Sequence, residues 1–207
     1  MRQDDTLYTR NAVPGTAVYG ERLVSIDGIE YRRWSPLRSK LAALILLGHR
    51  EVPLEVDSRV LYLGAASGTT ASHMSEICAG GILYCVEVSQ RSFRDLVRLC
   101  ESRLNMIPIL GDASRPDDYD PIVERADIVY QDIAQRLQVN IFLRNLRHFH
   151  AHAGILMLKS RSMNVSKDPQ RVFAEVKAKL SAEGVQVNDV VDLSPYSKDH
   201  AAFIVEV

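Results

Sequence analysis

The stretch 60–70 combines residue types that can hold a polar ligand close to the backbone. A short apolar run stops at Gly64, Gly68 follows, and Thr69 and Thr70 open an amphipathic segment. This pattern predicts a strand, a tight turn and the N-terminus of a helix. Glycine lets the backbone approach a ligand, and the first helical turn presents free N–H groups to polar or anionic atoms. The spacing differs from the G-x-G-x-x-G dinucleotide fingerprint.

A second apolar run, 82–87, ends in Glu87, about two dozen residues after Gly64. At this spacing, α/β nucleotide domains place a carboxylate that binds ribose hydroxyls. Each feature has a plainer explanation, because glycine turns also serve chain packing and an acid at a strand end can be a solvated charge. Together, the glycine turn and the acid favour a nucleoside-binding site.

Charged side chains also follow three further predicted strands. Asp112, Asp132 and Lys159 each stand at or just past the end of one of these strands. In a parallel sheet, ligands bind beyond the carboxyl ends of the strands, so we expect these side chains to meet in one cleft. We expect Asp132 and Lys159 to form an ion pair. It is either a structural salt bridge or a proton-handling pair whose pKa values shift through burial and mutual charge.

The histidines and cysteines predict no metal site. His148, His150 and His152 alternate, but they run across a helix end without matching carboxylates or cysteines, so we expect them on the surface. His200 stands beside Asp199 at the start of the last predicted strand, where a single histidine is more often structural than catalytic. The three cysteines lack C-x-x-C spacing and lie in apolar patterns, as expected for small buried hydrophobic residues in a reducing compartment.

The elements that must position these residues alternate between strand and helix along residues 57–207. Their strands are nearly unbroken apolar runs, which indicates a sheet covered by helices on both faces. We therefore predict an α/β domain with a doubly wound, mostly parallel, seven-stranded sheet.

Residues 1–56 have a different sequence pattern, with short pieces of β type. This pattern predicts a small antiparallel β subdomain followed by a connecting helix. Asp27-Gly28 is a hairpin turn signal, and 16–19 is one of several short pieces of β type. We expect the helix to begin at Ser35-Pro36 and to carry Lys40 beside its apolar stripe, where a lysine usually reaches into solvent.

The formal net charge of −1 excludes nucleic-acid binding by bulk positive charge, so any basic surface is local. Arg22, Arg32 and Arg33 cluster with Tyr31 and Trp34. Nucleic-acid contact is one explanation of this cluster, and arginines on a solvated hairpin face are the commoner one. The chain shows no apolar signal core near its start and no apolar stretch long enough to span a bilayer.

Taken together, seven segments of the chain match the pattern of a known family. They are residues 18–23, 31–43, 61–70, 108–113, 132–135, 159–162 and 198–200. On these residues the chain resembles fibrillarin, in particular its archaeal form, over almost its full length. The resemblance implies a Rossmann-like methyltransferase that uses S-adenosylmethionine and methylates the 2′-hydroxyl of RNA riboses.

The resemblance also implies a set of cofactor-binding residues. They are Gly64, Ala65, Gly68, Thr69, Thr70, Glu87, Val88, Asp112, Ala113, Asp132, Ile133, Ala134 and Gln135. Thr69 and Thr70 fall at the methionine end of the cofactor, Glu87 at the ribose hydroxyls, and Asp112 at the adenine. Val88 departs from the family, in which an aromatic residue is common at this position, and Arg136 stands where a proline is usual.

The catalytic set of the family falls on Lys40, Asp132, Lys159 and His200. The resemblance implies that Lys159, paired with Asp132, acts on the ribose hydroxyl. It either deprotonates this hydroxyl or stabilises the developing alkoxide through its charge. Lys40 and His200 are expected to orient the ribose or phosphate of the substrate.

The family's partners are a box C/D guide RNA, the target RNA, a Nop-type scaffold protein and a kink-turn-binding ribosomal-type protein. The resemblance implies these partners here, with no membrane and no metal, in the cytoplasm of an archaeal cell or, for a eukaryotic chain, the nucleolus. Two alternatives stay open at this point: a methyltransferase acting on a glutamine side chain of a protein, and a non-catalytic scaffold subunit of an RNP. A nicotinamide oxidoreductase is disfavoured because the dinucleotide fingerprint is missing.

Overall fold

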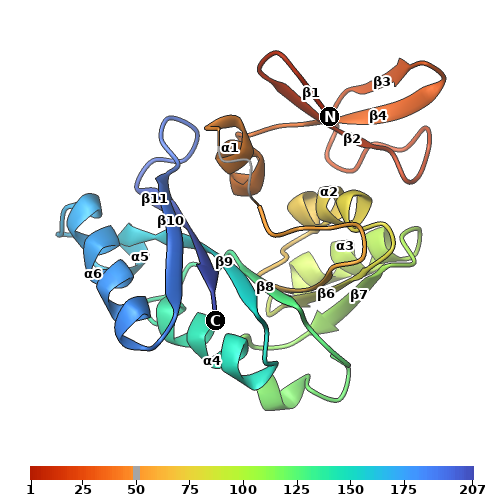
Figure 1. The fold of residues 1–207 in the computed structure, drawn as a ribbon. Helices are drawn as coiled ribbons and strands as arrows, with labels where there is room; N and C mark the ends of the chain where they lie inside the picture. The colour runs from red at the N-terminus through yellow and green to blue at the C-terminus, as the bar shows by residue number, and fades with distance from the viewer. Residues whose placement is uncertain (49–51) are drawn as a thin grey trace.

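A seven-stranded sheet forms the centre of the molecule in the computed structural model, which describes residues 1–48 and 52–207 (Figure 1). The strand order is β10-β11-β9-β8-β5-β6-β7, and β11 runs antiparallel to both of its neighbours while the other pairs are parallel. The predicted doubly wound, mostly parallel sheet is therefore confirmed. The strands are β5 (Arg59–Leu63), β6 (Ile82–Glu87), β7 (Met106–Leu110), β8 (Ile128–Gln131), β9 (Ala153–Lys159), β10 (Gln186–Asp192) and β11 (His200–Glu206).

Helices cover both faces of this sheet, as the apolar strands require. One hydrophobic core lies under α4 and α6, and a second core lies under α1, α2 and α3 (Figure 1). Successive residues of β5 show the division, because Leu61 belongs to the first core and Tyr62 to the second. The helices are α1 (Lys40–Leu46), α2 (Thr69–Ile77), α3 (Gln90–Cys100), α4 (Gln138–His148), α5 (Ser160–Met163) and α6 (Pro169–Ala182), with a 3₁₀ turn at Pro116–Asp118.

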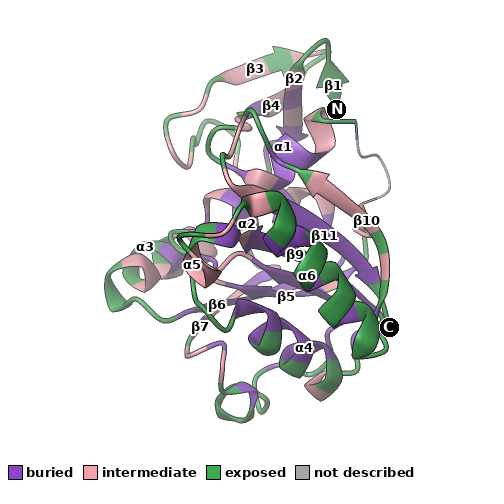
Figure 2. Ribbon diagram, turned by 90° about the vertical axis from the view of Figure 1, so that its left-hand side faces the viewer, coloured by how far each residue is buried: buried purple, intermediate pink, exposed green. Residues whose placement is uncertain are grey.

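A second, four-stranded antiparallel sheet is formed by the N-terminal segment and packs above α2 (Figure 2). Its order is β1-β2-β4-β3, with bounds β1 (Arg2–Gln3), β2 (Thr6–Arg10), β3 (Leu23–Ile26) and β4 (Ile29–Trp34). The predicted hairpin turn is confirmed, because Asp27 and Gly28 both adopt positive φ angles, 52° and 78°.

The β piece expected at 16–19 is wrong, because this segment is an irregular loop. The Glu21 carboxylate accepts hydrogen bonds from the backbone N–H of Val18 (3.0 Å) and of Tyr19 (2.8 Å). These two backbone donors are consequently bonded to a side chain rather than to a neighbouring strand.

Arg32 does not lie on a solvated hairpin face. Its guanidinium is fully buried and donates to Glu21 (2.5 Å), Glu76 (2.7 Å) and Ser72 (2.9 Å). Glu76 and Ser72 belong to α2, so this pairing ties the N-terminal sheet to the large domain. The division of the chain after residue 56 stays a prediction.

Helix α1 begins four residues later than the Ser35-Pro36 signal suggests. Ser39 is the N-cap, since its hydroxyl accepts from the backbone N–H of Ala42 (3.4 Å), whereas 36–38 form a turn. Lys40 is therefore the first helical residue, and its side chain is directed toward the strand ends of the large sheet rather than into solvent.

Candidate functional site

The glycine turn after β5 brings the backbone close to the loop that follows β8. Gly64 has a φ of +83°, and a Cβ at this position would lie 2.6 Å from the carbonyl oxygen of Asp132. The N–H groups of Gly64 and Ala65 both donate to the carbonyl of Val86 on β6 (2.9 and 3.1 Å). Only glycine fits here, because both the backbone angle and the available space exclude a side chain.

A cavity of about 300 Å³ opens beyond the carboxyl ends of the parallel strands. Strand order reverses between β5 and β8, which is the switch point where α/β sheets bind their ligands. The cavity is lined by Gly64, Ala66, Val86, Glu87, Val88, Gly111, Asp112, Ala113, Asp132, Ile133, Ala134, Gln135 and Lys159. The structure thus brings together most of the cofactor-binding residues that the resemblance implies.

Four residues of the implied cofactor set do not line this cavity: Ala65, Gly68, Thr69 and Thr70. The Thr70 side chain is buried, and its hydroxyl donates to Ser39 Oγ (3.0 Å). Thr69 instead lines a separate hollow of about 410 Å³ between the N-terminal loop and α3. The role of these four residues at the methionine end stays a prediction. Sequence reasoning missed Ala66, Val86 and Gly111, although each adjoins a residue in the implied set.

Glu87 is held in the cavity as a hydrogen-bond acceptor. Its side chain is nearly buried, Oε2 accepts from the backbone N–H of Ala66 (2.8 Å), and Oε1 accepts from that of Ser89 (2.7 Å). An ionised carboxylate has about four lone-pair sites, so both oxygens can still accept from hydroxyls. Asp112 is fixed in a similar way, because its Oδ1 accepts from the N–H of Ser114 (2.8 Å).

Asp132 pairs with Lys40 and not with Lys159, so the expected partner was wrong. Lys40 Nζ lies 2.7 Å from each carboxylate oxygen of Asp132, and the two side chains are only 16% and 15% exposed. The expectation that Lys40 reaches into solvent is also wrong, because capping by Ser39 aims the first turn of α1 at the strand ends. Among the described residues, Lys159 has no ion-pair partner.

Lys159 and His200 stand side by side at the ends of β9 and β11, where they are directly opposed in the strand register. Burial, and then the nearby charge of Lys40, lower the pKa of Lys159, while Asp132 acts in the opposite direction. Burial also lowers the pKa of His200. His200 Nδ1 lies 2.6 Å from the carbonyl of Lys198, which fixes the proton on Nδ1. Its Nε2 is buried without a partner among the described residues and is free to accept a hydrogen bond.

Two glutamines that sequence reasoning missed connect the Asp132 loop to Lys159. Gln138 is fully buried, and its Nε2 donates to the carbonyls of Gln135 and Lys159 (3.0 Å each). Gln138 Oε1 accepts from the backbone N–H of Lys159 (3.0 Å). The backbone carbonyl of Gln138 accepts from Gln131 Nε2 (2.7 Å). No local pattern marks such a residue, because its partner Lys159 lies on a separate strand, 21 residues away in the chain.

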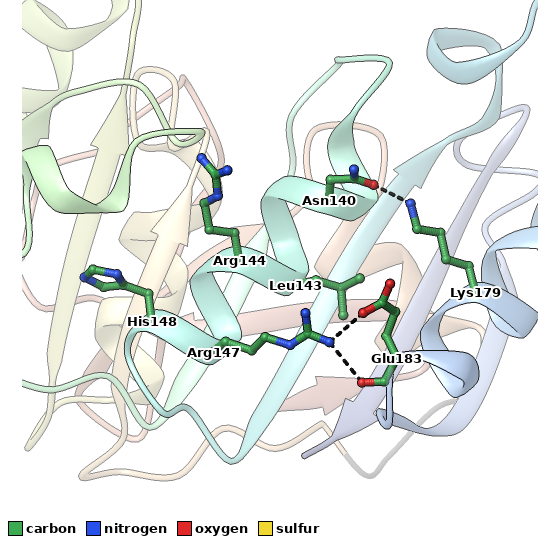
Figure 3. A pocket seen from close by; sticks show the side chains of 7 residues that line it. All are labelled: Asn140, Leu143, Arg144, Arg147, His148, Lys179 and Glu183. Atoms are coloured by element: carbon green, nitrogen blue, oxygen red, sulfur yellow. Dashed lines mark hydrogen bonds and ion pairs between the residues drawn. The ribbon is translucent and has the colours of Figure 1, made fainter.

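A larger hollow of about 520 Å³ lies between α4 and α6 (Figure 3). It is lined by Asn140, Leu143, Arg144, Arg147, His148, Lys179 and Glu183. Its charged groups are already paired, as in Arg147–Glu183 (2.7 Å) and His148–Asp120 (3.0 Å). It also lies away from the strand ends that carry the acids and lysines. We therefore assign the site to the smaller cavity.

Other chemistries have little support in the described ranges 1–48 and 52–207. No group of three or more His, Cys, Asp or Glu there is placed to hold a metal ion. Burial raises the pKa of the Cys78 thiol to about 12 and also raises that of Cys85, so neither thiol is a reactive nucleophile. No helix in these ranges has the length and apolar character needed to cross a bilayer.

Comparison with known proteins agrees with this geometry. A family model described as fibrillarin matches residues 1–207. The fibrillarin-like rRNA/tRNA 2′-O-methyltransferase of Methanopyrus kandleri is 50% identical over 201 residues, which cover 96% of this chain and 87% of that protein.

Two solved structures share the whole fold. Aeropyrum pernix fibrillarin with natively bound S-adenosyl-L-methionine superposes with a TM-score of 0.88 at 44% identity, covering 96% of this chain and 87% of that one. A chain of a fibrillarin/Nop5p complex superposes with a TM-score of 0.89 at 43% identity, covering 99% and 95%. The matched sequence extends through the glycine turn, the strand-end acids and both lysines, and on these grounds the chain belongs to the fibrillarin family.

Proposed function

We propose that this protein transfers a methyl group from S-adenosylmethionine to the 2′-hydroxyl of a ribose in RNA. The observation that carries the proposal is the position of Lys159, which lines the ligand cavity and stands opposite His200 in the strand register. The name of the Methanopyrus kandleri relative, an rRNA/tRNA 2′-O-methyltransferase, supports ribosomal and transfer RNA as the substrate class.

The cavity has the chemistry that an adenosine moiety needs. Glu87 offers carboxylate oxygens to the ribose hydroxyls, and Asp112 with Ala113 forms the wall for the adenine. The absence of a side chain at Gly64 lets the Asp132 loop pack directly against the turn after β5, which forms one wall of the cavity. Thr69 and Thr70, at the N-terminus of α2, are proposed to bind the carboxylate of the cofactor's methionine moiety. The natively bound cofactor of the Aeropyrum pernix protein supports this assignment.

S-adenosylmethionine supplies an activated methyl group on a positively charged sulfur. The protein must orient the ribose hydroxyl and remove its proton. Lys159 is the proposed proton acceptor, because its pKa is lowered and no carboxylate holds its ammonium in an ion pair among the described residues. Lys40, held by Asp132, provides positive charge for the developing oxyanion. His200 Nε2 is free to accept a hydrogen bond from the substrate and orient it.

We further propose that the protein acts within an RNP. The solved fibrillarin/Nop5p complex supports a Nop-type scaffold protein as partner. The near-neutral charge of the chain suits an enzyme that is recruited by partners rather than by its own bulk charge. A box C/D guide RNA that pairs with the target RNA, and a kink-turn-binding protein, complete the proposed assembly. Base pairing would then select the methylated nucleotide.

The deciding experiment supplies methyl-labelled S-adenosylmethionine to the purified protein with scaffold, kink-turn-binding protein, guide and target RNA. Label is expected in one ribose of the target with the wild-type protein and not with Lys159→Ala. Labelling of a glutamine in a protein, without guide or partners, would instead identify a protein methyltransferase. Cofactor binding without any transfer would identify a scaffold subunit.

A further inference from the structure

The outward side of the N-terminal sheet carries arginine and tyrosine in alternating positions. In the strand register, Tyr8 is opposite Arg33, and Arg10 is opposite Tyr31. The Arg33 N–H donates to the carbonyl of Arg22 (2.9 Å), which continues the first row. Directly opposed residues of antiparallel strands share a face, so these five residues form one surface, here called the outer face. The opposite side of the sheet packs on α2 (Figure 1).

The three arginines of the outer face, Arg10, Arg22 and Arg33, are exposed. Their side chains form no hydrogen bond or ion pair with any residue in the described part of the chain. Exposed arginines elsewhere are commonly paired, as in Arg115–Asp118 (3.0 Å) and Arg161–Asp199 (3.0 Å). The outer face is therefore a local concentration of uncompensated positive charge on a chain whose formal net charge is −1.

Adjacent residues of β4 show that this charge arrangement is specific to one side. Arg32 points inward, where it is buried against Glu21 and Glu76. Arg33 points outward, with no acid opposite it in the register. Glu30, the acid within β4, lies two residues before Arg32 and therefore on the inward side of the strand, where its Oε1 accepts from Asn11 Nδ2 (2.6 Å). Asp27 lies in the turn between β3 and β4.

The tyrosines supply the second element of a nucleic-acid surface. Tyr8 and Tyr31 are partly exposed, and their hydroxyls have no partner in the ranges that the structure describes. Aromatic rings on a sheet surface are platforms on which unpaired bases stack, and neighbouring arginines bind the phosphates. A duplex offers no free base face, so this combination favours a single strand.

The chain itself connects the outer face to the site. β4 ends at Trp34, and the chain then passes through one turn that carries exposed Arg38 before Lys40 opens α1. This connection places one further exposed arginine, Arg38, between the outer face and Lys40 in the sequence.

We propose that the outer face binds a single-stranded segment of the target RNA that lies beyond the stretch paired with the guide. This inference rests on the proposed function, because it assumes an RNA substrate.

The test measures binding of a short, unstructured, fluorescein-labelled RNA to the full-length protein by fluorescence anisotropy over a series of salt concentrations. Arg10→Ala combined with Arg33→Ala removes two phosphate-binding charges. The slope of log K against log salt is expected to fall by about 1.4, since each single-strand phosphate contact contributes about 0.7. Tyr8→Ala combined with Tyr31→Ala is expected to weaken binding about tenfold or more, and the paired Tyr→Phe changes are expected to preserve it.

The matched control is Arg91→Ala combined with Arg94→Ala, which removes the same charge from an exposed stretch of α3. This control is expected to bind RNA with the wild-type salt slope. Thermal melting and S-adenosylmethionine binding by calorimetry, expected to be unchanged in every variant, establish that the fold and the cofactor site are intact.

Equal RNA affinity of the outer-face variants and the control, or no RNA binding by the wild-type protein at low salt, overturns the inference. Loss of Nop-type protein binding with unchanged RNA binding also overturns it, and shows a protein contact instead. A failed transfer assay together with outer-face-dependent RNA binding counts against the proposed function alone.

Discussion

At the residue scale, the site depends on which charges are paired. Asp132 holds Lys40 through both carboxylate oxygens, while burial and the nearby charge of Lys40 lower the pKa of Lys159. A carboxylate bound directly to Lys159 would raise this pKa and oppose proton acceptance. Because Asp132 is bound to Lys40, no carboxylate in the described part of the chain pairs with the Lys159 ammonium, and the pKa of Lys159 is lowered.

Lys159→Arg separates proton acceptance from electrostatic stabilisation. The wild-type transfer rate is expected to rise with pH until it passes the lowered pKa of Lys159, since only neutral lysine accepts the proton. Arginine stays charged throughout, so the variant is expected to transfer methyl groups about 10²–10⁴-fold more slowly. Its pH–rate profile is expected to lack the rise at low pH that the wild-type protein shows. Single-turnover methyl transfer in the assembled complex, measured across pH, checks this. A variant that keeps near-wild-type activity at all pH values would show that Lys159 acts only through its charge.

At the scale of elements, short contacts between turns and strand ends set the shape of the cavity. The turn after β5 touches the loop after β8 at Gly64, and Gln138 of α4 joins that same loop to the end of β9. These contacts hold residues from three strands in one constellation. Changes in the contacts are expected to alter the site without removing any group that touches a substrate.

Gly64→Ala is expected to destabilise the protein by more than the cost of a positive φ, about 1–2 kcal/mol, because the new Cβ meets the Asp132 carbonyl. Gly184→Ala is the matched control: its φ is +82° and no atom lies within 4 Å of the added Cβ. Urea unfolding measures both free energies, and calorimetry measures cofactor affinity, which is expected to fall only for Gly64→Ala. Equal destabilisation by the two changes would show that the Asp132 loop can move aside.

Gln138→Leu tests a positioning residue. It removes the bonds that orient the backbone of Lys159 and leaves buried polar groups unpaired, at a cost of about 1–3 kcal/mol. We expect a lower kcat and a displaced acid limb of the pH profile. The control is Asn140→Ala, an exposed change on the same helix. A lower melting temperature with an unchanged pH profile would assign Gln138 a structural role only.

At the scale of the whole molecule, buried ion pairs connect the N-terminal sheet to the large domain. Arg32, between Glu21 and Glu76, is fully enclosed, and Trp34 stacks on His73 of α2 with ring centroids 4.9 Å apart. Burial, with Arg32 and Arg103 nearby, lowers the pKa of His73 to about 2, so its ring is neutral in this interface. The inner side of the sheet thereby fixes the direction in which the outer face points.

Arg32→Met is expected to destabilise the protein by about 3–5 kcal/mol, because it leaves buried carboxylates without their cation. Arg33→Met, the same change one residue further on, is expected to stay within about 0.5 kcal/mol, since Arg33 is exposed and unpaired within the described chain. Chemical denaturation followed by circular dichroism compares the two. Coincident unfolding curves would contradict the role assigned to the buried arginine.

Sequence by itself determined the doubly wound sheet, the glycine turn and the acids at the strand ends. Each of these features is indicated by residues that are close together in the sequence: apolar runs indicate the strands, glycine spacing indicates the turn, and charged residues stand at or just past strand ends. The resemblance to fibrillarin added Lys40 and His200, whose local surroundings indicated no catalytic role.

Only the tertiary structure decided which of these groups pair. Lys40 and Asp132 are 92 residues apart in the chain, and buried Arg32 pairs with Glu76, 44 residues away. Gln138 joins the loop after β8 to the end of β9, and no periodicity in the sequence connects these two segments. The physical reason is that burial and hydrogen-bond partners depend on distances between segments, whereas a local pattern specifies only how each segment folds and which side of it is apolar.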